Sequence, residues 1–320
     1  MNFGWVILGL VLLYYGAEWL VKGSSDLALK AGISPLVVGL TVVAFGTSAP
    51  ELLVSVSANL QDPPQGDFAL GNVVGSNICN LALVLGLAAL IRPLSIHNQV
   101  LKREMPILLV ATVVFVAMLW DGQVSRFEGI LLVLGIIIYV VSSIIACRRG
   151  ADLDFEVEEL QEDLESVVNA GPGLVMKSLL LILVGLGGLV IGADRLVAGG
   201  GALALAWGVP EAVIALTLVA FSTSLPEVAT TVVAALKGKG DLAVGSAVGS
   251  CIFNLLVVIG LTAIIAPLSS VDLQTVDLWV MGGLTFLIFP MMWTRRLLGR
   301  AEGGLLLGGY LVYVVWLFLR

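Results

Sequence analysis

Long runs of apolar residues divide the chain into ten segments, separated by short polar connections. A helix that crosses a bilayer needs about 20 mainly apolar residues, and each segment approaches or exceeds that length. The predicted spans cover residues 3–21, 34–60, 68–91, 103–120, 128–147, 174–194, 209–236, 241–265, 274–293 and 303–319. The pattern therefore predicts an all-α polytopic membrane protein with ten transmembrane helices.

Two of these spans contain a proline followed directly by a glutamate. The sequence GTSAPE runs from Gly46 to Glu51, and STSLPE runs from Ser222 to Glu227. Proline removes a backbone N–H and breaks the helical hydrogen-bond ladder. Unwound backbone at membrane depth is tolerated only inside protein or along a watery cavity. We therefore expect the second and seventh spans to break near the midplane, where a carboxylate marks a functional site.

Each expected break gathers oxygen atoms around its carboxylate. Freed backbone carbonyls and hydroxyl groups join Glu51 and Glu227, and a shell of oxygens is what hard cations bind. The hydroxyl donors are Thr47, Ser48, Thr223 and Ser224. A structural kink with a hydrogen-bonded glutamate is the alternative for a single motif, but the duplication of the motif argues against it.

The two halves of the chain repeat each other. Residues 32–60 align with 208–236, and residues 67–94 align with 241–268, with 30 of 57 positions identical. Because each half has an odd number of spans, five, the second half crosses the membrane with the opposite topology. Inverted repeats with broken helices are typical of secondary transporters. We expect a first inverted repeat over residues 1–150, an acidic linker over 151–173 and a second repeat over 174–320.

A second pair of matched segments follows the breaks. GNVVGSNICN (71–80) and GSAVGSCIFN (245–254) each place a serine and an asparagine four residues apart, on one helix face. Their neutral oxygens can complete the shell of a cation, whereas a small-residue packing face with interhelical hydrogen bonds is the alternative. The four candidates are Ser76, Asn80, Ser250 and Asn254. We expect the third and eighth spans, which carry them, to be interrupted as well.

Composition agrees with a membrane protein, and charge fixes its orientation. Hydrophobic residues make up 59% of the chain and charged residues only 12%. With the N-terminus outside, thirteen of the 16 Lys and Arg residues lie in inward connections, as the positive-inside rule requires. We expect both termini on the outer face of the plasma (inner) membrane and the acidic linker in the cytoplasm.

These motifs resemble the alpha repeats of the cation/calcium exchanger superfamily, in the sodium/calcium exchanger branch with its prokaryotic members. The resemblance rests on GTSAPE, STSLPE and the two GS-x-x-x-N segments, and covers almost the whole chain. It implies that Glu51 and Glu227 are ligands shared by Ca²⁺ and Na⁺, flanked by the hydroxyl and amide donors named above. It also implies backbone carbonyl ligands at Ala44 and Ala220, and first and sixth spans that slide as a gating pair.

The resemblance implies a secondary active antiporter that exchanges Ca²⁺ for Na⁺ by alternating access. Asn254 stands where potassium-dependent relatives have aspartate, which argues against potassium co-transport. A proton- or potassium-coupled exchanger of the same fold is the alternative, and a cation channel is less favoured. We expect no enzyme activity, no cofactor and no nucleic-acid partner, so the partners are Ca²⁺, Na⁺, H⁺ as a further candidate, and the lipid bilayer.

Overall fold

The computed structural model describes residues 2–31, 35–148, 173–207, 222–270 and 275–319, and these residues are mostly helical. Seven helical segments of this part are long and apolar enough to cross a membrane, or up to eight when one bent pair is counted as a span. The prediction of a membrane protein built from helices is confirmed. The first half of the seventh predicted span lies outside the described residues.

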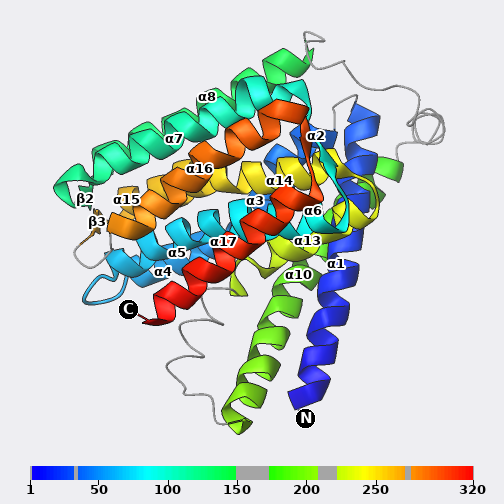
Figure 1. Cartoon of the computed structure of the whole chain (residues 1–320), viewed down its shortest axis with the longest axis horizontal. Helices are drawn as coiled ribbons and strands as arrows, with labels where there is room; N and C mark the ends of the chain where they lie inside the picture. Colours follow the sequence, from blue (N-terminus) through cyan, green and yellow to red (C-terminus); the bar gives the residue numbers. More distant parts are fainter. Residues whose placement is uncertain (1, 32–34, 149–172, 208–221, 271–274, 320) are drawn as a thin grey trace.

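The elements follow the predicted spans in order (Figure 1). The first half contains α1 (Asn2–Ala31), α2 (Pro35–Val38), a π-helical segment (Gly39–Val43), α3 (Ala44–Thr47), α4 (Ala49–Asn59), α5 (Gly66–Ile78), a second π-helical segment (Cys79–Val84), α6 (Leu85–Ile91), β1 (Leu94–Ser95), a third π-helical segment (Val100–Glu104), α7 (Met105–Met118), a 3₁₀ turn (Leu119–Asp121), β2 (Gln123–Val124) and α8 (Arg126–Arg148). The second half contains α10 (Gly173–Ala206), α13 (Leu225–Leu236), α14 (Gly240–Phe253), a fourth π-helical segment (Asn254–Val258), α15 (Ile259–Ile265), β3 (Leu268–Ser269), α16 (Thr275–Arg295), β4 (Leu297–Leu298) and α17 (Arg300–Leu319).

The third and eighth spans form the centre of the molecule. In the helical runs Gly66–Ile91 and Gly240–Ile265, 78% and 83% of the most apolar stretch is buried, against 22–39% in the other long spans. The expected interruption of these two spans is wrong, because each run stays helical and only widens into a π-helical segment. Neither segment contains a proline, so the backbone keeps its hydrogen bonds in a shifted register.

The helices α1 and α10 form an antiparallel pair that projects from the rest of the bundle (Figure 1). They contain 30 and 34 residues, which is longer than the predicted spans 3–21 and 174–194. Glycines let the two backbones touch. A Cβ atom added at Gly16 would lie 2.9 Å from the carbonyl oxygen of Gly185, and one at Gly9 would lie 2.8 Å from that of Gly192.

Two short antiparallel sheets join the two halves of the chain. Leu94 of β1 pairs with Leu298 of β4, and Val124 of β2 pairs with Leu268 of β3. Each sheet takes one strand from each half, and Leu94 and Leu268 are aligned positions of the sequence repeat. The connections between spans are therefore tied together across the halves, which fixes the ends of the central helices.

Candidate cation-binding site

The second span bends at the first motif. Residues Gly39–Thr47 and Ala49–Asn59 meet at 46°, with Ser48 at the joint. Pro50 lies in the first turn of α4, where a missing N–H costs nothing, because the first N–H groups of a helix have no partner within it. Glu51 follows in the same turn, so the bend places its carboxylate at the start of a helix inside the protein.

The second motif has the same local geometry in its described part. Ser224 precedes α13 with φ −88° and ψ 0°, close to the −86° and 4° of Ser48. Pro226 and Glu227 then lie in the first turn of α13. Ala220, which the resemblance implies as a carbonyl ligand, lies outside the described residues.

The structure brings the two motifs into contact at their carboxylates. Glu51 and Glu227 are fully buried. The Oγ atom of Ser48 donates a hydrogen bond to Oε1 of Glu227 at 3.2 Å, and Oγ of Ser224 lies 3.5 Å from Oε1 of Glu51. Each motif therefore holds the glutamate of the other, and the two carboxylates belong to one cluster.

The serines of the central helices join the same cluster. Ser76 Oγ donates to Oε1 of Glu51 at 3.3 Å and lies 3.2 Å from Oγ of Ser224. Ser250 Oγ lies 3.4 Å from Oγ1 of Thr47, and both hydroxyls approach Glu227. The hydroxyl of Thr223 approaches Glu51 in the same way.

Two asparagines complete this arrangement from the central helices. Asn80 and Asn254 are fully buried, one turn of helix beyond Ser76 and Ser250. The Nδ2 atom of Asn254 donates to Oδ1 of Asn77 at 3.1 Å. All predicted side-chain ligands are thus buried, and hydrogen-bond contacts link most of them into one network between α4, α5, α13 and α14.

Several oxygen atoms in this cluster are left without a hydrogen-bond partner. They are Oε2 of Glu51, Oε2 of Glu227, Oδ1 of Asn80 and Oδ1 of Asn254. A buried polar atom without a partner costs about 1–3 kcal/mol, and more when it is charged. Neither carboxylate has a basic partner among the described residues, so a bound metal cation or protons must neutralise the pair. A desolvated cation satisfies carboxylate and amide oxygens together.

The donor set is dominated by neutral oxygens. Among the described residues there is no group of three or more His, Cys, Asp and Glu side chains that could hold a metal ion. Two carboxylates with hydroxyl and amide oxygens suit hard cations such as Na⁺ and Ca²⁺ better than transition metals, which favour imidazole and thiolate ligands. The backbone carbonyl of Ala44, another implied ligand, accepts the N–H of Ser48 at 3.0 Å.

Two further asparagines near the cluster were not predicted as site residues from the sequence. Asn72 Nδ2 donates to the backbone oxygen of Glu51 at 3.2 Å, and its Oδ1 accepts a hydrogen bond from Thr223 at 3.4 Å. Asn77 donates to the backbone oxygen of Cys251 at 3.4 Å. Both positions differ between the repeats, so a search for matched residues passes over them. Their only sequence signal is an amide side chain inside an apolar helix.

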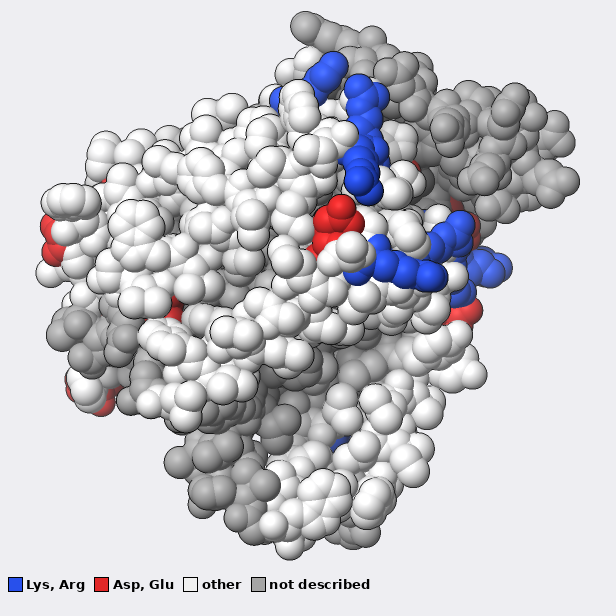
Figure 2. All heavy atoms as spheres, in the orientation of Figure 1, with Lys and Arg blue, Asp and Glu red and all other residues white. Residues whose placement is uncertain are grey.

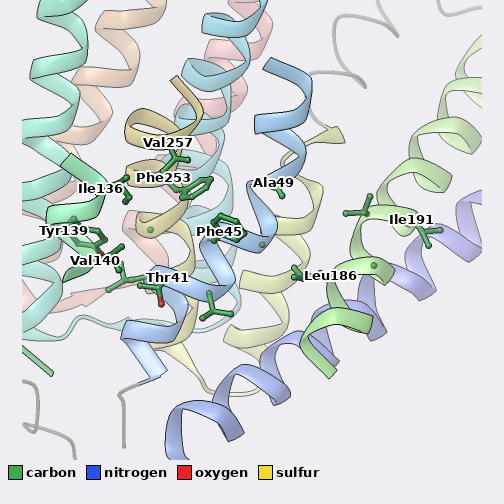
Figure 3. A pocket seen from close by; sticks show the side chains of 16 residues that line it. Thr41, Phe45, Ala49, Ile136, Tyr139, Val140, Leu186, Ile191, Phe253 and Val257 are labelled. Carbon is green, nitrogen blue, oxygen red and sulfur yellow. The ribbon is translucent and has the colours of Figure 1, made fainter. Parts of the chain in front are cut away.

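A large apolar cavity lies beside the cluster. It has a volume of about 850 Å³ and is bounded by the bent second span, α8, α10 and α14 (Figure 3). Phe45 and Ala49 line one wall, Tyr139 of α8 a second, and Leu186 and Ile191 of α10 face them from across the cavity. Apolar walls cannot replace the hydration shell of an ion, so this cavity is not the cation site.

The fold is that of an integral membrane exchanger. The chain belongs to the sodium/calcium exchanger protein family, whose model matches residues 1–145 and 177–319. The resemblance found in the sequence motifs is therefore confirmed, and the family is one of transporters and not of enzymes.

Several relatives match over nearly their whole length. The chain is 38% identical over 315 residues to the inner membrane protein YrbG of Escherichia coli, covering 98% of this chain and 95% of that protein. It is 33% identical over 349 residues to the sodium/calcium exchanger MaX1 of Methanosarcina acetivorans, covering 99% of both.

Solved structures of the sodium-calcium exchanger NCX_Mj share the fold. The form soaked with zero Na⁺ and Ca²⁺ superimposes with a TM-score of 0.83 at 31% identity, covering 99% of this chain and 98% of that one. The form soaked with 2.5 mM Na⁺ and 0.1 mM Ca²⁺ has a TM-score of 0.80 at 31% identity, covering 98% and 97%.

Proposed function

We propose that this protein is a secondary active antiporter that exchanges Ca²⁺ for Na⁺ by alternating access. The observation that carries the proposal is the pair of buried carboxylates, Glu51 and Glu227, which share one cluster and have no basic partner among the described residues. The relatives support the choice of ions, since MaX1 and NCX_Mj are named as sodium/calcium exchangers.

The proposed ligands surround the two carboxylates. Glu51 and Glu227 bind both ions, and the flanking donors are Thr47, Ser48, Ser76, Asn80, Thr223, Ser224, Ser250 and Asn254, with the backbone carbonyls of Ala44 and Ala220. The unpartnered oxygens of the glutamates and asparagines favour this set, because an ion is the group that would satisfy them together.

Charge determines when the site can reorient. Two ionised glutamates neutralise one Ca²⁺, whereas three Na⁺ would leave one positive charge and make the exchange electrogenic. The empty site carries two negative charges, and their burial in a low-dielectric interior is expensive. The transporter therefore changes its accessible face when loaded and not when empty, which makes the exchange obligatory.

The proposal includes ten spans in two inverted repeats, 1–150 and 174–320. Its support is that equivalent contacts occur in both halves. Gly86 of α6 packs on Gly303 of α17, and Gly260 of α15 packs on Gly129 of α8 at the positions 174 residues away. Asn77 and its aligned position Cys251 contact each other, as residues next to a two-fold axis do.

Orientation follows from the distribution of charge. On the face shown in Figure 2, most Lys and Arg side chains gather at one end of the bundle. At the opposite end of this face, Asp and Glu side chains are visible without Lys or Arg beside them. We assign the basic end to the cytoplasm, which places both termini outside and the linker 151–173 inside. The plasma (inner) membrane is the proposed location.

The apolar cavity gives room for the movement. It separates α10 from α8, while α1 and α10 hold each other through close glycine contacts. We propose that the two helices slide as one unit against the other eight spans and so alternate access to the cluster.

The test is uptake of radioactive Ca²⁺ by proteoliposomes containing the purified protein. Vesicles loaded with Na⁺ and diluted into Na⁺-free buffer should accumulate Ca²⁺, whereas vesicles loaded with K⁺ or given only a pH step should not. Uptake driven by the pH step or the K⁺ gradient alone would instead identify the proton- or potassium-coupled exchanger. Single-channel current steps in planar bilayers would contradict both.

A further inference from the structure

A small pocket lies at the end of α16 and is formed by residues outside the carboxylate cluster. It has a volume of about 140 Å³ and is lined by Asn98, Leu101, Lys102, Trp293 and Arg296. It lies where the loop after β1 and the π-helical segment Val100–Glu104 meet the end of α16. Because two cationic side chains, an amide and an indole border one space, the pocket suits a small anionic group.

The backbone of Arg296 has a conformation that side chains usually avoid. Its φ angle is 49°, and it is the one residue other than glycine with a positive φ in the described part of the chain. In the left-handed region the Cβ atom crowds the following carbonyl oxygen, so glycine is the usual residue at this position after a helix. The carbonyl oxygen of Arg296 accepts the N–H of Ile96 at 2.8 Å, which holds the end of α16 against the loop that carries Asn98.

The matching turn in the first half of the chain contains glycine. The 174-residue offset that relates Leu94 to Leu268 places Gly122 at Arg296. Gly122 has φ 78°, and its carbonyl oxygen accepts the N–H of Ser270 at 2.8 Å, which is the same bond as in the other half. Glycine adopts this turn freely, whereas arginine adopts it at a cost in backbone energy, which favours a role for the Arg296 side chain.

The positive charge of the pocket is not neutralised by the described residues. None of the ion pairs in this part of the chain includes Lys102 or Arg296. Glu104, the acid closest to Lys102 in the sequence, is buried and accepts the side-chain amide of Gln99 at 3.2 Å. The 174-residue offset places Val276 at Lys102, so the matching turn of the other half lacks both cations.

The surroundings of the pocket favour a lipid over a soluble anion. Trp279, Phe286 and Trp293 recur every seven residues on α16 and are 73%, 55% and 53% exposed, so an apolar stripe runs along this helix to the pocket. Tryptophan is enriched where a membrane meets water, and basic pockets between spans on the cytoplasmic side bind anionic headgroups. The pocket belongs to the basic end of the bundle, which the proposed orientation assigns to the cytoplasm (Figure 2).

We propose that this pocket binds the phosphate of an anionic phospholipid. Lys102 and Arg296 hold the phosphate, Asn98 donates to one of its oxygens, and the acyl chains lie along the stripe that ends at Trp293. The site goes beyond the exchange function and does not depend on it, because it shares no residue with the carboxylate cluster.

Lipid binding to the purified full chain in a neutral detergent tests the proposal. Phosphatidylglycerol, phosphatidylcholine with the same acyl chains, and inorganic phosphate are added separately, and the melting temperature is followed. Phosphatidylglycerol should raise it with saturation, and native mass spectrometry should show one tightly bound copy per chain. The other two should bind about tenfold more weakly or not at all. An equal effect of inorganic phosphate would assign the pocket to a soluble anion, and an equal effect of phosphatidylcholine would remove the charge selection; either would overturn the proposal.

Three variants locate the bound lipid. Arg296→Gly suits the left-handed turn, so the melting temperature without lipid should hold or rise, while the Kd for phosphatidylglycerol rises about fivefold or more. Lys102→Gln should raise the Kd by a similar factor. Arg295→Gln is the matched control, because it removes the same charge from the same helix end at a residue that does not line the pocket. Its Kd should change less than about twofold.

Two results with these variants would contradict the site. Unchanged binding of phosphatidylglycerol in Arg296→Gly would show that its side chain holds no phosphate. Equal weakening in Arg295→Gln and Arg296→Gly would reduce the effect to general surface charge. Both measurements are made without an ion gradient, so failure of the proposed exchange would leave their outcome unaffected.

Discussion

At the scale of single residues, the molecule depends on two acidic groups without a basic partner in the described structure. Glu51 and Glu227 are fully buried, and the side chains that donate hydrogen bonds to them are hydroxyl groups of the described residues. Hydroxyls lower the cost of burying a charge but do not cancel it, so the pair remains expensive when empty. In the proposed site, this cost favours the binding of a cation.

Neutralising either glutamate should therefore abolish exchange. Glu51→Gln and Glu227→Gln each keep the shape of the side chain but remove one of the two charges. We expect Na⁺-driven Ca²⁺ uptake to fall about 100-fold or more in each variant. Asp121→Asn, which changes an exposed acid in the 3₁₀ turn after α7, is the control and should transport normally. Full activity in either glutamine variant would refute the shared site.

Asn80 and Asn59 make a matched pair for separating binding from stability. Asn80 is buried, and neither polar atom of its amide makes a regular hydrogen bond to the described residues. The thiol of Cys251 lies nearby, but sulfur is a weak hydrogen-bond partner. Asn59 is also buried and its Oδ1 atom has no partner, but its Nδ2 atom donates to the backbone oxygen of Ala266 at 2.7 Å. The first amide is costly to bury in the empty protein, and the second stabilises it.

Replacement by leucine should act in opposite directions at these positions. Asn80→Leu should keep or raise the melting temperature of the cation-free protein in detergent and remove most of the stabilisation by Ca²⁺. Asn59→Leu should lower the stability by about 1–3 kcal/mol and keep the response to Ca²⁺. A large loss of cation-free stability in Asn80→Leu would show that its amide is structural.

The site residues that could be predicted from the sequence are those that occur at aligned positions of both repeats. Pro50 with Glu51 and Pro226 with Glu227 reveal themselves as polar interruptions of apolar runs, and Ser76 and Ser250 as matched hydroxyls. Asn72 could not be found in this way, because its aligned position is Ser246. Its importance comes from contacts between spans that are far apart in the sequence.

At the scale of elements, glycines in α1 and α10 let the backbones of this antiparallel pair come into direct contact. A Cβ atom at Gly185 would lie 2.7 Å from the backbone nitrogen of Leu20 and 2.8 Å from the carbonyl oxygen of Gly16. Close backbone approach is a common way to associate helices in lipid, where burying apolar surface gains little. The pair is thus rigid within itself while it borders the apolar cavity.

Two neighbouring glycines of α10 test this packing. Gly185→Ala should clash with α1, costing about 1–3 kcal/mol, and lower both the melting temperature and Ca²⁺ uptake. Gly187→Ala is the control, because no atom lies within 4 Å of an added Cβ atom there. Equal melting temperatures for the two variants would contradict the proposed helix contact.

Element boundaries were predictable only where chemistry marks them. Proline located the bend of the second span, but nothing in the apolar runs Cys79–Val84 and Asn254–Val258 distinguishes π-helical from α-helical hydrogen bonding. The helix α1 continues to Ala31 through residues that read as a polar connection, since Ser24 and Ser25 are buried by packing. The two-residue strands carry no alternating pattern at all.

At the scale of the whole molecule, the central proposal is that the two halves are inverted repeats. One end of the bundle is basic and the opposite end is acidic. The sheets β1–β4 and β2–β3 each join the two halves. A matched arrangement lets one cluster face either side of the membrane with little change inside each half.

Cysteine labelling tests the orientation of the molecule. In a background with Cys147 replaced by serine, Asp62→Cys should react with a membrane-impermeant maleimide in intact cells. Arg295→Cys, at the end of α16, should react only after permeabilisation. Cys79 and Cys251 are buried and serve as an internal control for unfolding. Labelling with the reverse pattern would invert the assigned topology.

The most direct test of the shared site is isothermal titration of the purified protein with Ca²⁺, repeated at rising Na⁺ concentration. We predict one Ca²⁺ bound per chain, an apparent Kd for Ca²⁺ that rises steeply with Na⁺, and loss of binding in both Glu51→Gln and Glu227→Gln. Calcium binding that is indifferent to Na⁺, or that survives in either variant, would contradict a single pocket serving both ions.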